Sequence, residues 1–201
     1  LTIENNIFSR YNYFIEGYNY MYTGSVLTLD NNVLEDMNSM FIYYLYMTGY
    51  DNDGSPSRLI ITNNNISGNN IGIDNLIDTN VIGDEYGIIM QDNIITSTSS
   101  PDWSINGSSM SAGSVLVEGN TFTKISLRIN YFQRSHITGN TLQDTEDSYA
   151  LYISRSNAVV EYNSIINNKY SGIYINADFN YLSAADTIRY NTITGNNTYN
   201  N

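Results

Sequence analysis

The sequence contains no cysteine, one histidine, two prolines and few charged residues, and these shortages exclude several classes of protein. Without cysteine there is no disulfide framework and no thiolate metal site. With His136 as the only histidine and no cluster of Met and His, a copper site is not supported either. Charged residues make up only 14% of the chain, and no helical window outcompetes the strand-like alternation. We therefore expect no metal, no cofactor and no helical fold.

Basic residues are especially scarce. Eight Lys and Arg stand against twenty Asp and Glu, which gives a net charge of −12. An acidic surface repels phosphate backbones and anionic headgroups, so we predict no nucleic-acid partner. No apolar run approaches the roughly 20 residues of a membrane span, so no membrane insertion is expected. The chain begins at Leu1 with neither an initiator Met nor a signal-peptide pattern. We expect a processed chain or a segment of a longer protein.

The abundant residues favour strands and turns. Of 201 residues, 41% are apolar and nineteen are Tyr, with many Ile and Asn. β-Branched and aromatic residues fit strands, while Asn and Gly supply turns. A six-residue phrase, apolar-x-x-Asn-x-apolar, recurs along almost the whole chain. Its copies surround Asn6, Asn32, Asn64, Asn80, Asn93, Asn120, Asn140, Asn163 and Asn191.

A second phrase, apolar-x-apolar-x, precedes most copies of the first. Clear examples begin at Leu127, Leu151 and Ile173. Alternation of this kind indicates a strand with one buried face. The Asn then interrupts the alternation at a bend, where it can adopt the left-handed backbone conformation and bond to Asn residues above and below it as a ladder.

The spacing of the phrases decides the architecture. With Asn80 set aside, successive copies lie 20 to 32 residues apart. Asn80 splits one interval, so either one short coil lies there or that match is accidental. Ankyrin-like and tetratricopeptide repeats need helical periodicity, and leucine-rich repeats need a denser Leu pattern. A compositional bias toward Asn and Ile could create single matches, but the paired phrases over 127–193 are too regular for that. We predict an all-β fold, a single-stranded right-handed parallel β-helix of about seven coils, as one domain over residues 1–201.

At this point the chain resembles a known group, the parallel β-helix repeat proteins of the pectate-lyase-like superfamily. The phrases Gly119-Asn120-Thr121-Phe122 and Gly139-Asn140-Thr141-Leu142 are similar to NosD-type repeats. Asn-rich versions are common in adhesin-like surface proteins of archaea and bacteria. The resemblance covers nearly all of residues 1–196 and implies fold and secretion more than chemistry.

Two segments depart from the repeat. Residues 97–112 match neither phrase and are rich in turn formers, which predicts a loop insertion that carries Trp103, the only Trp. Trp103 is either a recognition anchor or a ring that folds back to cover the solenoid. Residues 49–56 resemble the opening of a calcium loop, but they lack its third acidic position and its distal Glu, so a solvated turn is expected.

The sequence offers little support for catalysis. Uronate lyases need basic residues and calcium-binding acidic clusters, whereas this chain has eight basic residues in all. Glycoside hydrolysis needs two carboxyls that face one sugar. The adjacent pairs Asp84/Glu85 and Glu146/Asp147 fall in predicted turns. We name no catalytic residue and lean against an enzyme.

One region is a candidate binding surface. Aligning the coils places Arg128 beneath Tyr152 and Tyr174 on the outward side of consecutive strands, with Asn130, Ser154 and Asn176 in the next outward positions. Arg134, His136 and Arg155 are expected nearby. Stacked Tyr rings with Asn and Arg donors could hold neutral sugars, but aromatic columns also stabilise any sheet. The predicted ligand-binding residues are Arg128, Asn130, Tyr152, Tyr174, Asn176 and Trp103.

These patterns predict an extracellular or cell-surface β-helix with a structural or adhesive role. Its expected partners are polysaccharides or cell-surface glycans, and further copies of the chain stacked end to end or laterally. The alternative is a carbohydrate-active enzyme, such as a polysaccharide lyase, a hydrolase or a phage depolymerase. Asn65, Asn106 and Asn196 lie in glycosylation sequons, which arise readily by chance in so Asn-rich a chain.

Overall fold

The computed structural model describes residues 1–196 except 12–13, 23, 39–40, 48–56, 70, 72, 79–85, 100, 108–112, 147–148 and 177–185, and gives only the backbone of 16–20, 43–44, 73–78 and 107. In this part of the chain every regular element is a β-strand. No residue described belongs to a helix long and apolar enough to cross a membrane.

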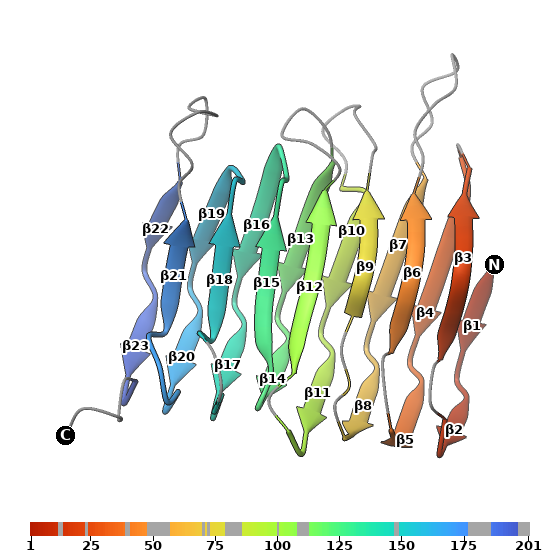
Figure 1. Cartoon of the computed structure of the whole chain (residues 1–201), viewed down its shortest axis with the longest axis horizontal. Helices are drawn as coiled ribbons and strands as arrows, with labels where there is room; N and C mark the ends of the chain where they lie inside the picture. Colours follow the sequence, from red (N-terminus) through yellow and green to blue (C-terminus); the bar gives the residue numbers. More distant parts are fainter. Residues whose placement is uncertain are drawn as a thin grey trace.

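The strands form three parallel sheets that wrap around one long core. Each strand pairs with the strand three places further along the chain, as β1 (Thr2–Glu4) does with β4 (Val26–Asp30). Each complete coil therefore contributes one strand to each sheet (Figure 1). Within the described residues, two sheets hold eight strands and the third holds seven, which makes seven complete coils and confirms the predicted parallel β-helix. The first strand, β1, and the last, β23 (Thr192–Thr194), lie at opposite ends of the stack (Figure 1).

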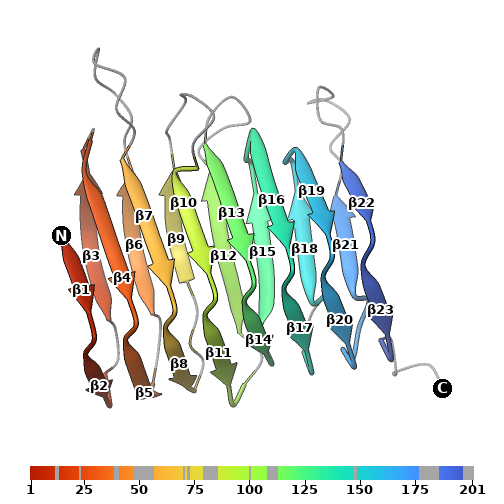
Figure 2. The same ribbon diagram turned by 180° about the vertical axis from the view of Figure 1, so that it is seen from behind.

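The first sheet is the face seen in Figure 2. Its strands, in spatial order, are β1 (Thr2–Glu4), β4 (Val26–Asp30), β7 (Arg58–Thr62), β10 (Ile88–Gln91), β13 (Ser114–Glu118), β16 (Arg134–Thr138), β19 (Ala158–Glu161) and β22 (Thr187–Arg189).

The second sheet consists of shorter strands. They are β2 (Ile7–Ser9), β5 (Val33–Met37), β8 (Asn65–Gly68), β11 (Ile94–Ser97), β14 (Thr121–Thr123), β17 (Thr141–Gln143), β20 (Ser164–Ile166) and β23 (Thr192–Thr194).

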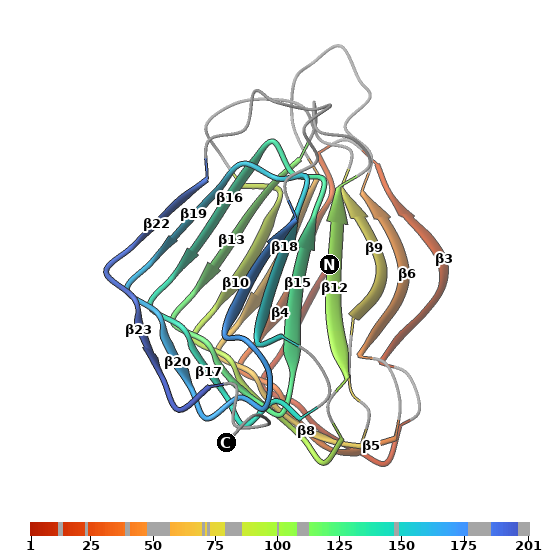
Figure 3. The same cartoon turned by 60° about the vertical axis from the view of Figure 1, so that its left-hand side comes forward.

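The third sheet is nearest the viewer in Figure 1, and Figure 3 shows how the three sheets enclose the core. Its strands are β3 (Ile15–Met21), β6 (Ile42–Met47), β9 (Ile73–Asp78), β12 (Asp102–Gly107), β15 (Ser126–Asn130), β18 (Leu151–Ser154) and β21 (Ile173–Asn176).

Alternation along each strand builds the core. In β7, Leu59 and Ile61 are buried while their neighbours are partly exposed. The parallel register then places apolar residues of successive coils in one inward column, such as Met90, Val117 and Ile137. Burial of each such side chain stabilises the fold by about 1.5–3 kcal/mol, so the repeat supplies a continuous hydrophobic core.

The predicted insertion at residues 97–112 is wrong over its central part. Residues 102–107 form β12, which pairs with both β9 and β15. The alternation Trp103-Ser-Ile105-Asn106 outweighs the turn-forming composition of the flanking segments, because it continues the register of the third sheet. Residues 100 and 108–112 lie outside the described part of the chain, as does the whole calcium-like segment 49–56.

Trp103 belongs to the core and not to a recognition surface. Its side chain is fully buried and its indole Nε1–H donates to the Ile71 carbonyl oxygen at 2.9 Å. The indole stacks on Phe41, with ring centroids 5.8 Å apart, and meets Phe122 edge-on at 5.9 Å. An inward position on β12 forces this burial, which removes Trp103 from the candidate binding residues.

The Asn phrase forms the ladder that the sequence predicted. At the corner between the first and second sheets, which we call the ladder corner, each backbone N–H and side-chain amide of one Asn donates to the side-chain oxygen of the Asn in the next coil. From Asn32 to Asn163 these side chains are buried, and the backbone N···O distances are 2.9–3.0 Å. Asn64 bonds directly to Asn93, so Asn80, which lies outside the described residues, is not needed for this contact.

The bend itself is made by a different residue than predicted. The left-handed conformation belongs to the residue before each ladder Asn, with φ between 51° and 67°. The ladder Asn is instead held by the hydrogen bonds of its side-chain amide, and these bonds are its contribution to the fold. The left-handed residues of this corner are Asn5, Asn31, Asn63, Asp92, Gly119, Gly139, Tyr162 and Tyr190.

Candidate functional site

The predicted column on the outer face of the third sheet is present. Register pairs Arg128 with Tyr152 and Tyr152 with Tyr174. The two Tyr rings are stacked with centroids 5.4 Å apart, and the Arg128 guanidinium carbon lies 5.4 Å from the Tyr152 ring centroid. Tyr149, which the sequence pattern missed because it precedes the strand, stacks on Tyr174 at 4.4 Å. We call Tyr149, Tyr152 and Tyr174 the strand tyrosines.

A column of amides and a hydroxyl runs beside these rings. Register aligns Asn106, Asn130, Ser154 and Asn176. Asn130 donates its side-chain amide to the Asn106 side-chain oxygen at 2.9 Å, and Asn176 donates to the Tyr152 hydroxyl at 3.3 Å. The exposed Asn176 and partly exposed Asn130 therefore present polar groups next to the ring edges.

Arg128 is held in place from two sides. Its Nε lies 2.9 Å from the Asp102 Oδ1, and its guanidinium packs over Tyr152. This ion pair is partly exposed, so it contributes little stability, but it fixes the orientation of the cation. Arg155 lies just beyond the end of β18, where it donates to the Tyr131 hydroxyl. Arg134 and His136 are on β16 of the first sheet, so the predicted cation cluster is divided between two faces.

The stacking limits what the strand tyrosines can do. Rings that lie face to face in consecutive coils cover one another, so a ligand reaches mainly their hydroxyl edges. Such aromatic pairs contribute about 0.5–1.5 kcal/mol to the sheet. The surface can therefore offer hydrogen bonds from Tyr hydroxyls, amides and Arg128, with little free ring face for apolar contact.

A second aromatic pair lies at the ladder corner. Tyr162 and Tyr190 are stacked with ring centroids 5.2 Å apart and an interplanar angle of 16°. Their exposed fractions are 61% and 67%, the highest among the described tyrosines of the last coils. Both occupy the position directly before a ladder Asn, which is the sequence signal that could have identified them. We call them the corner tyrosines.

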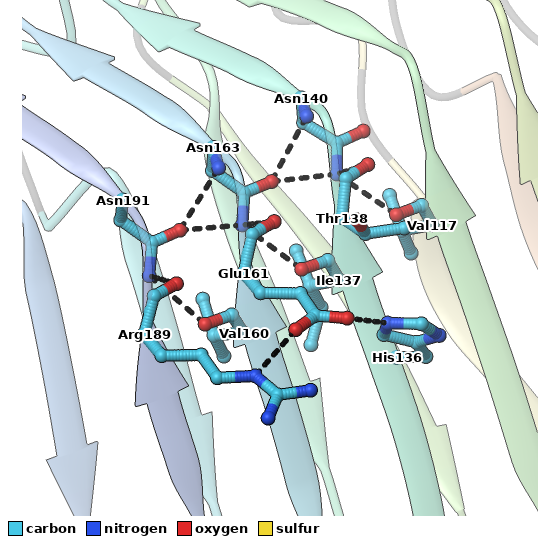
Figure 4. A network of polar contacts seen from close by, with 10 residues as sticks. All are labelled: Val117, His136, Ile137, Thr138, Asn140, Val160, Glu161, Asn163, Arg189 and Asn191. Atoms are coloured by element: carbon cyan, nitrogen blue, oxygen red, sulfur yellow. Dashed lines mark hydrogen bonds and ion pairs between the residues drawn. The ribbon is translucent and has the colours of Figure 1, made fainter.

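A polar cluster is formed by Glu161 and Arg189, the residues directly before the corner tyrosines, together with His136; Figure 4 shows these three side chains. The Arg189 Nε–H donates to Glu161 Oε2 at 2.6 Å, while the other carboxylate oxygen lies 3.1 Å from His136 Nε2. The pairing of Glu161 with Arg189 was predicted, but Glu161 is 9% exposed and has two partners, so this is more than an ordinary surface pair. The hydrogen bond from Arg189 lowers the pKa of the Glu161 carboxyl, with a smaller contribution from His136, against the opposing effect of burial.

The described residues form no site for metal binding or for catalysis by paired carboxyl groups. No group of three or more His, Asp or Glu side chains in them could hold a metal ion. Asp84, Glu85 and Asp147 lie outside the described residues, and Glu146 is paired with Lys124 Nζ at 2.8 Å. Catalysis by those paired carboxyls therefore has no structural support within the described residues.

The three sequons differ in environment. Asn65 is exposed on β8, whereas the Asn106 side chain accepts the bond from Asn130. Asn196 accepts from Asn168 and donates its amide to the Ile165 carbonyl at 2.9 Å, in a second, shorter ladder between the second and third sheets. Among the three, Asn65 is the sequon whose amide is best placed for modification.

Comparison with known proteins identifies the family. The model of the right-handed β-helix region matches residues 57–200, well over half of the chain. Neither the curated proteins nor the solved structures that were searched give a match. The three-sheet coil and the ladder agree with this assignment. The chain belongs to the right-handed parallel β-helix family.

Proposed function

We propose that this β-helix is a non-catalytic structural or adhesive module of an extracellular or cell-surface protein, and that it binds glycans on the outer face of the third sheet. The observation that carries the proposal is the pair of parallel columns, Arg128 to Tyr174 and Asn130 to Asn176, that line one face over three coils. The similarity to NosD-type and adhesin-like repeats supports the same role.

The chemistry of this face suits neutral sugars. Ring edges, amides and one guanidinium offer several donors and acceptors to sugar hydroxyls, and their repetition from coil to coil suits a repeating polymer. A net charge of −12 disfavours polyanionic glycans. Because the ring faces cover one another, recognition depends on the Tyr hydroxyls more than on apolar stacking.

A structural role would also involve contacts between copies. An outward column of aliphatic side chains on the first sheet, Ile60, Ile89 and Leu116, is partly exposed and in register. Apolar side chains on a solvent-facing sheet favour association, which supports lateral contact in a filament. End-to-end stacking belongs to the same proposal.

The glycan-binding role is tested with Tyr174→Phe, which keeps the ring stack and removes one hydroxyl. Isothermal titration with neutral oligosaccharides should show about fivefold weaker binding, as expected for the loss of one hydrogen bond of about 1 kcal/mol. Tyr11→Phe, at an exposed tyrosine outside the third sheet, is the matched control and should bind like the native protein. Equal affinities for Tyr174→Phe and the native protein would remove the strand tyrosines from the site.

The same titrations examine the enzymatic alternative. Incubation with each oligosaccharide should leave it intact, whereas new reducing ends or unsaturated products would indicate a hydrolase or a lyase. Turnover that survives substitution of Arg128, Tyr152 and Tyr174 would place catalysis elsewhere on the molecule.

A further inference from the structure

The ladder corner changes abruptly in side-chain size near its C-terminal end. The left-handed position is Asp92 in one coil, Gly119 and Gly139 in the next two, and then Tyr162 and Tyr190. Two coils without a side chain therefore lie between a carboxylate and an exposed aromatic ring. This arrangement leaves a step in the outer surface of the corner.

One face of the Tyr162 ring looks into this step. Tyr162 stacks on Tyr190 with an interplanar angle of 16°, and the coils follow in the order Gly139, Tyr162, Tyr190. The face that does not contact Tyr190 is therefore directed toward the coil of Gly139. The Arg189 guanidinium carbon lies 5.6 Å from the Tyr190 ring centroid, so a cation also lies close to the pair.

The space over Gly139 is open. A Cβ atom added there would meet only the Gly119 backbone nitrogen, at 3.8 Å. A Cβ atom on Gly119 would instead lie 2.4 Å from Asp92 Oδ1, so the Asp92 carboxylate already occupies the space over Gly119. Coils are about 4.8 Å apart, which leaves roughly 10 Å between the Tyr162 ring and that carboxylate. A single six-membered ring fits between them.

Hydroxyl groups border this space, which we call the corner shelf. Thr138 ends β16 on one side and Thr141 begins β17 on the other, and both are partly exposed. At the far end the carboxylate of the exposed Asp92 can accept hydrogen bonds from ligand hydroxyls. With Glu118 close by on the first sheet, an anionic ligand would be repelled.

Tyr162 has the left-handed backbone that every residue before a ladder Asn adopts, from Asn5 to Tyr190. Its φ is +57°, a conformation that is a genuine outlier for a bulky residue and that Gly119 and Gly139 adopt at little cost. The ring is 61% exposed, so burial does not offset the strain.

We propose that the corner shelf binds one pyranose ring of a neutral glycan. The sugar's C–H face packs on the free face of Tyr162, above Gly139, and its hydroxyls bond to Asp92, Thr138 and Thr141. The ligand class rests on the proposed glycan-binding function. The site itself is separate from the strand tyrosines, because it lies at the ladder corner and not on the third sheet.

The test is titration with neutral hexaoses of glucose, mannose and N-acetylglucosamine, with polygalacturonate as the anionic comparison. Tyr162→Gly should weaken binding of the best neutral hexaose at least about tenfold. Gly139→Asn should do the same, because Asn tolerates the left-handed conformation and its side chain fills the shelf. Tyr190→Gly is the matched control, since that ring lies on the far side of Tyr162, and it should stay within about threefold of the native affinity. On ligand addition, the backbone amide signals of Gly119 and Gly139 should shift.

Three outcomes would overturn the proposal. If Tyr190→Gly loses as much affinity as Tyr162→Gly, the ligand lies on the outer side of the tyrosine pair and not on the shelf. If Tyr174→Phe weakens binding while Tyr162→Gly and Gly139→Asn do not, the shelf is wrong and the third-sheet site stands. If no neutral hexaose binds the native protein, both sites fail. Circular dichroism of each variant confirms that loss of binding is not loss of fold.

Discussion

The strand tyrosines and the corner tyrosines are built from the same parts in two different backbones. In both, Tyr rings from consecutive coils are stacked and an arginine lies over a ring, Arg128 over Tyr152 and Arg189 over Tyr190. Tyr152 and Tyr174 lie on strands, where stacking is the ordinary result of parallel register. The corner tyrosines need a left-handed backbone that costs about 1–2 kcal/mol for a residue with a Cβ atom. A column that stabilises the fold and a pair that strains it therefore look alike in sequence.

The largest expected effect on stability comes from removing one Asn of the ladder. Asn163→Ala should lower the free energy of unfolding by about 3 kcal/mol, because it leaves the buried amide groups of Asn140 and the Ile137 carbonyl without their partner. Chemical denaturation measures the change. Hydrogen exchange should accelerate most at the Asn140 amide and less at Tyr152, which would separate corner from strand.

The exposed Asn65 provides the control for this substitution. Asn65→Ala should change the stability by less than about 0.5 kcal/mol, as for other surface positions. If the two variants are destabilised alike, the ladder contributes no more than an exposed amide and its assigned role is wrong.

The same substitution at the two kinds of tyrosine should act in opposite directions. Tyr152→Gly removes a stacked ring and adds backbone freedom to a strand, so we expect a loss of about 2 kcal/mol. Tyr162→Gly relieves the left-handed strain while losing one exposed stack, so the protein should be as stable as the native form or up to about 1 kcal/mol more stable. Thermal and urea denaturation of both variants measure these changes in the free energy of unfolding. A loss above 1 kcal/mol for Tyr162→Gly would show that the corner pair stabilises the fold.

The smallest expected effect is the response of the corner to acid. The pKa of Glu161 is lowered chiefly by the hydrogen bond from Arg189. Its contribution to stability is therefore complete above the pKa of the unfolded chain, near 4.5, and is lost as the pH falls through the lower pKa of the folded protein. Between pH 7 and pH 3, native protein should lose more stability than Glu161→Gln.

The two tyrosine groups provide an internal control for this titration. Arg189 lies over Tyr190, so the ring signals of Tyr190 in NMR spectra should follow the ionisation of Glu161. Those of Tyr152, on another sheet, should not. Ring signals that titrate together, or a Glu161→Gln variant as acid-sensitive as the native protein, would contradict the assignment.

Much of the scaffold and part of the binding face could be read from the sequence, because both follow from short periodic patterns. The phrase apolar-x-apolar-x predicted the stacking of Arg128, Tyr152 and Tyr174, which the register confirms, although whether they bind a ligand stays a prediction. The same phrase was overlooked at Trp103-Ser-Ile105-Asn106, because neighbouring Ser, Pro and Gly residues indicated a loop. The stacking of Tyr162 on Tyr190 was not predicted, because the bend was assigned to the Asn that follows each of them.

The sequence by itself determined the coil: alternating apolar residues need an inside, and a recurrent Asn with buried amide bonds needs an equivalent Asn in the next coil. Only the tertiary structure decided which outward side chains meet, because coils of different length come into register through the sheets and not through a fixed sequence interval. It also decided the sign of φ at each corner. With this backbone conformation, the space over Gly139 is open, and the exposed ring of the strained Tyr162 lies beside it.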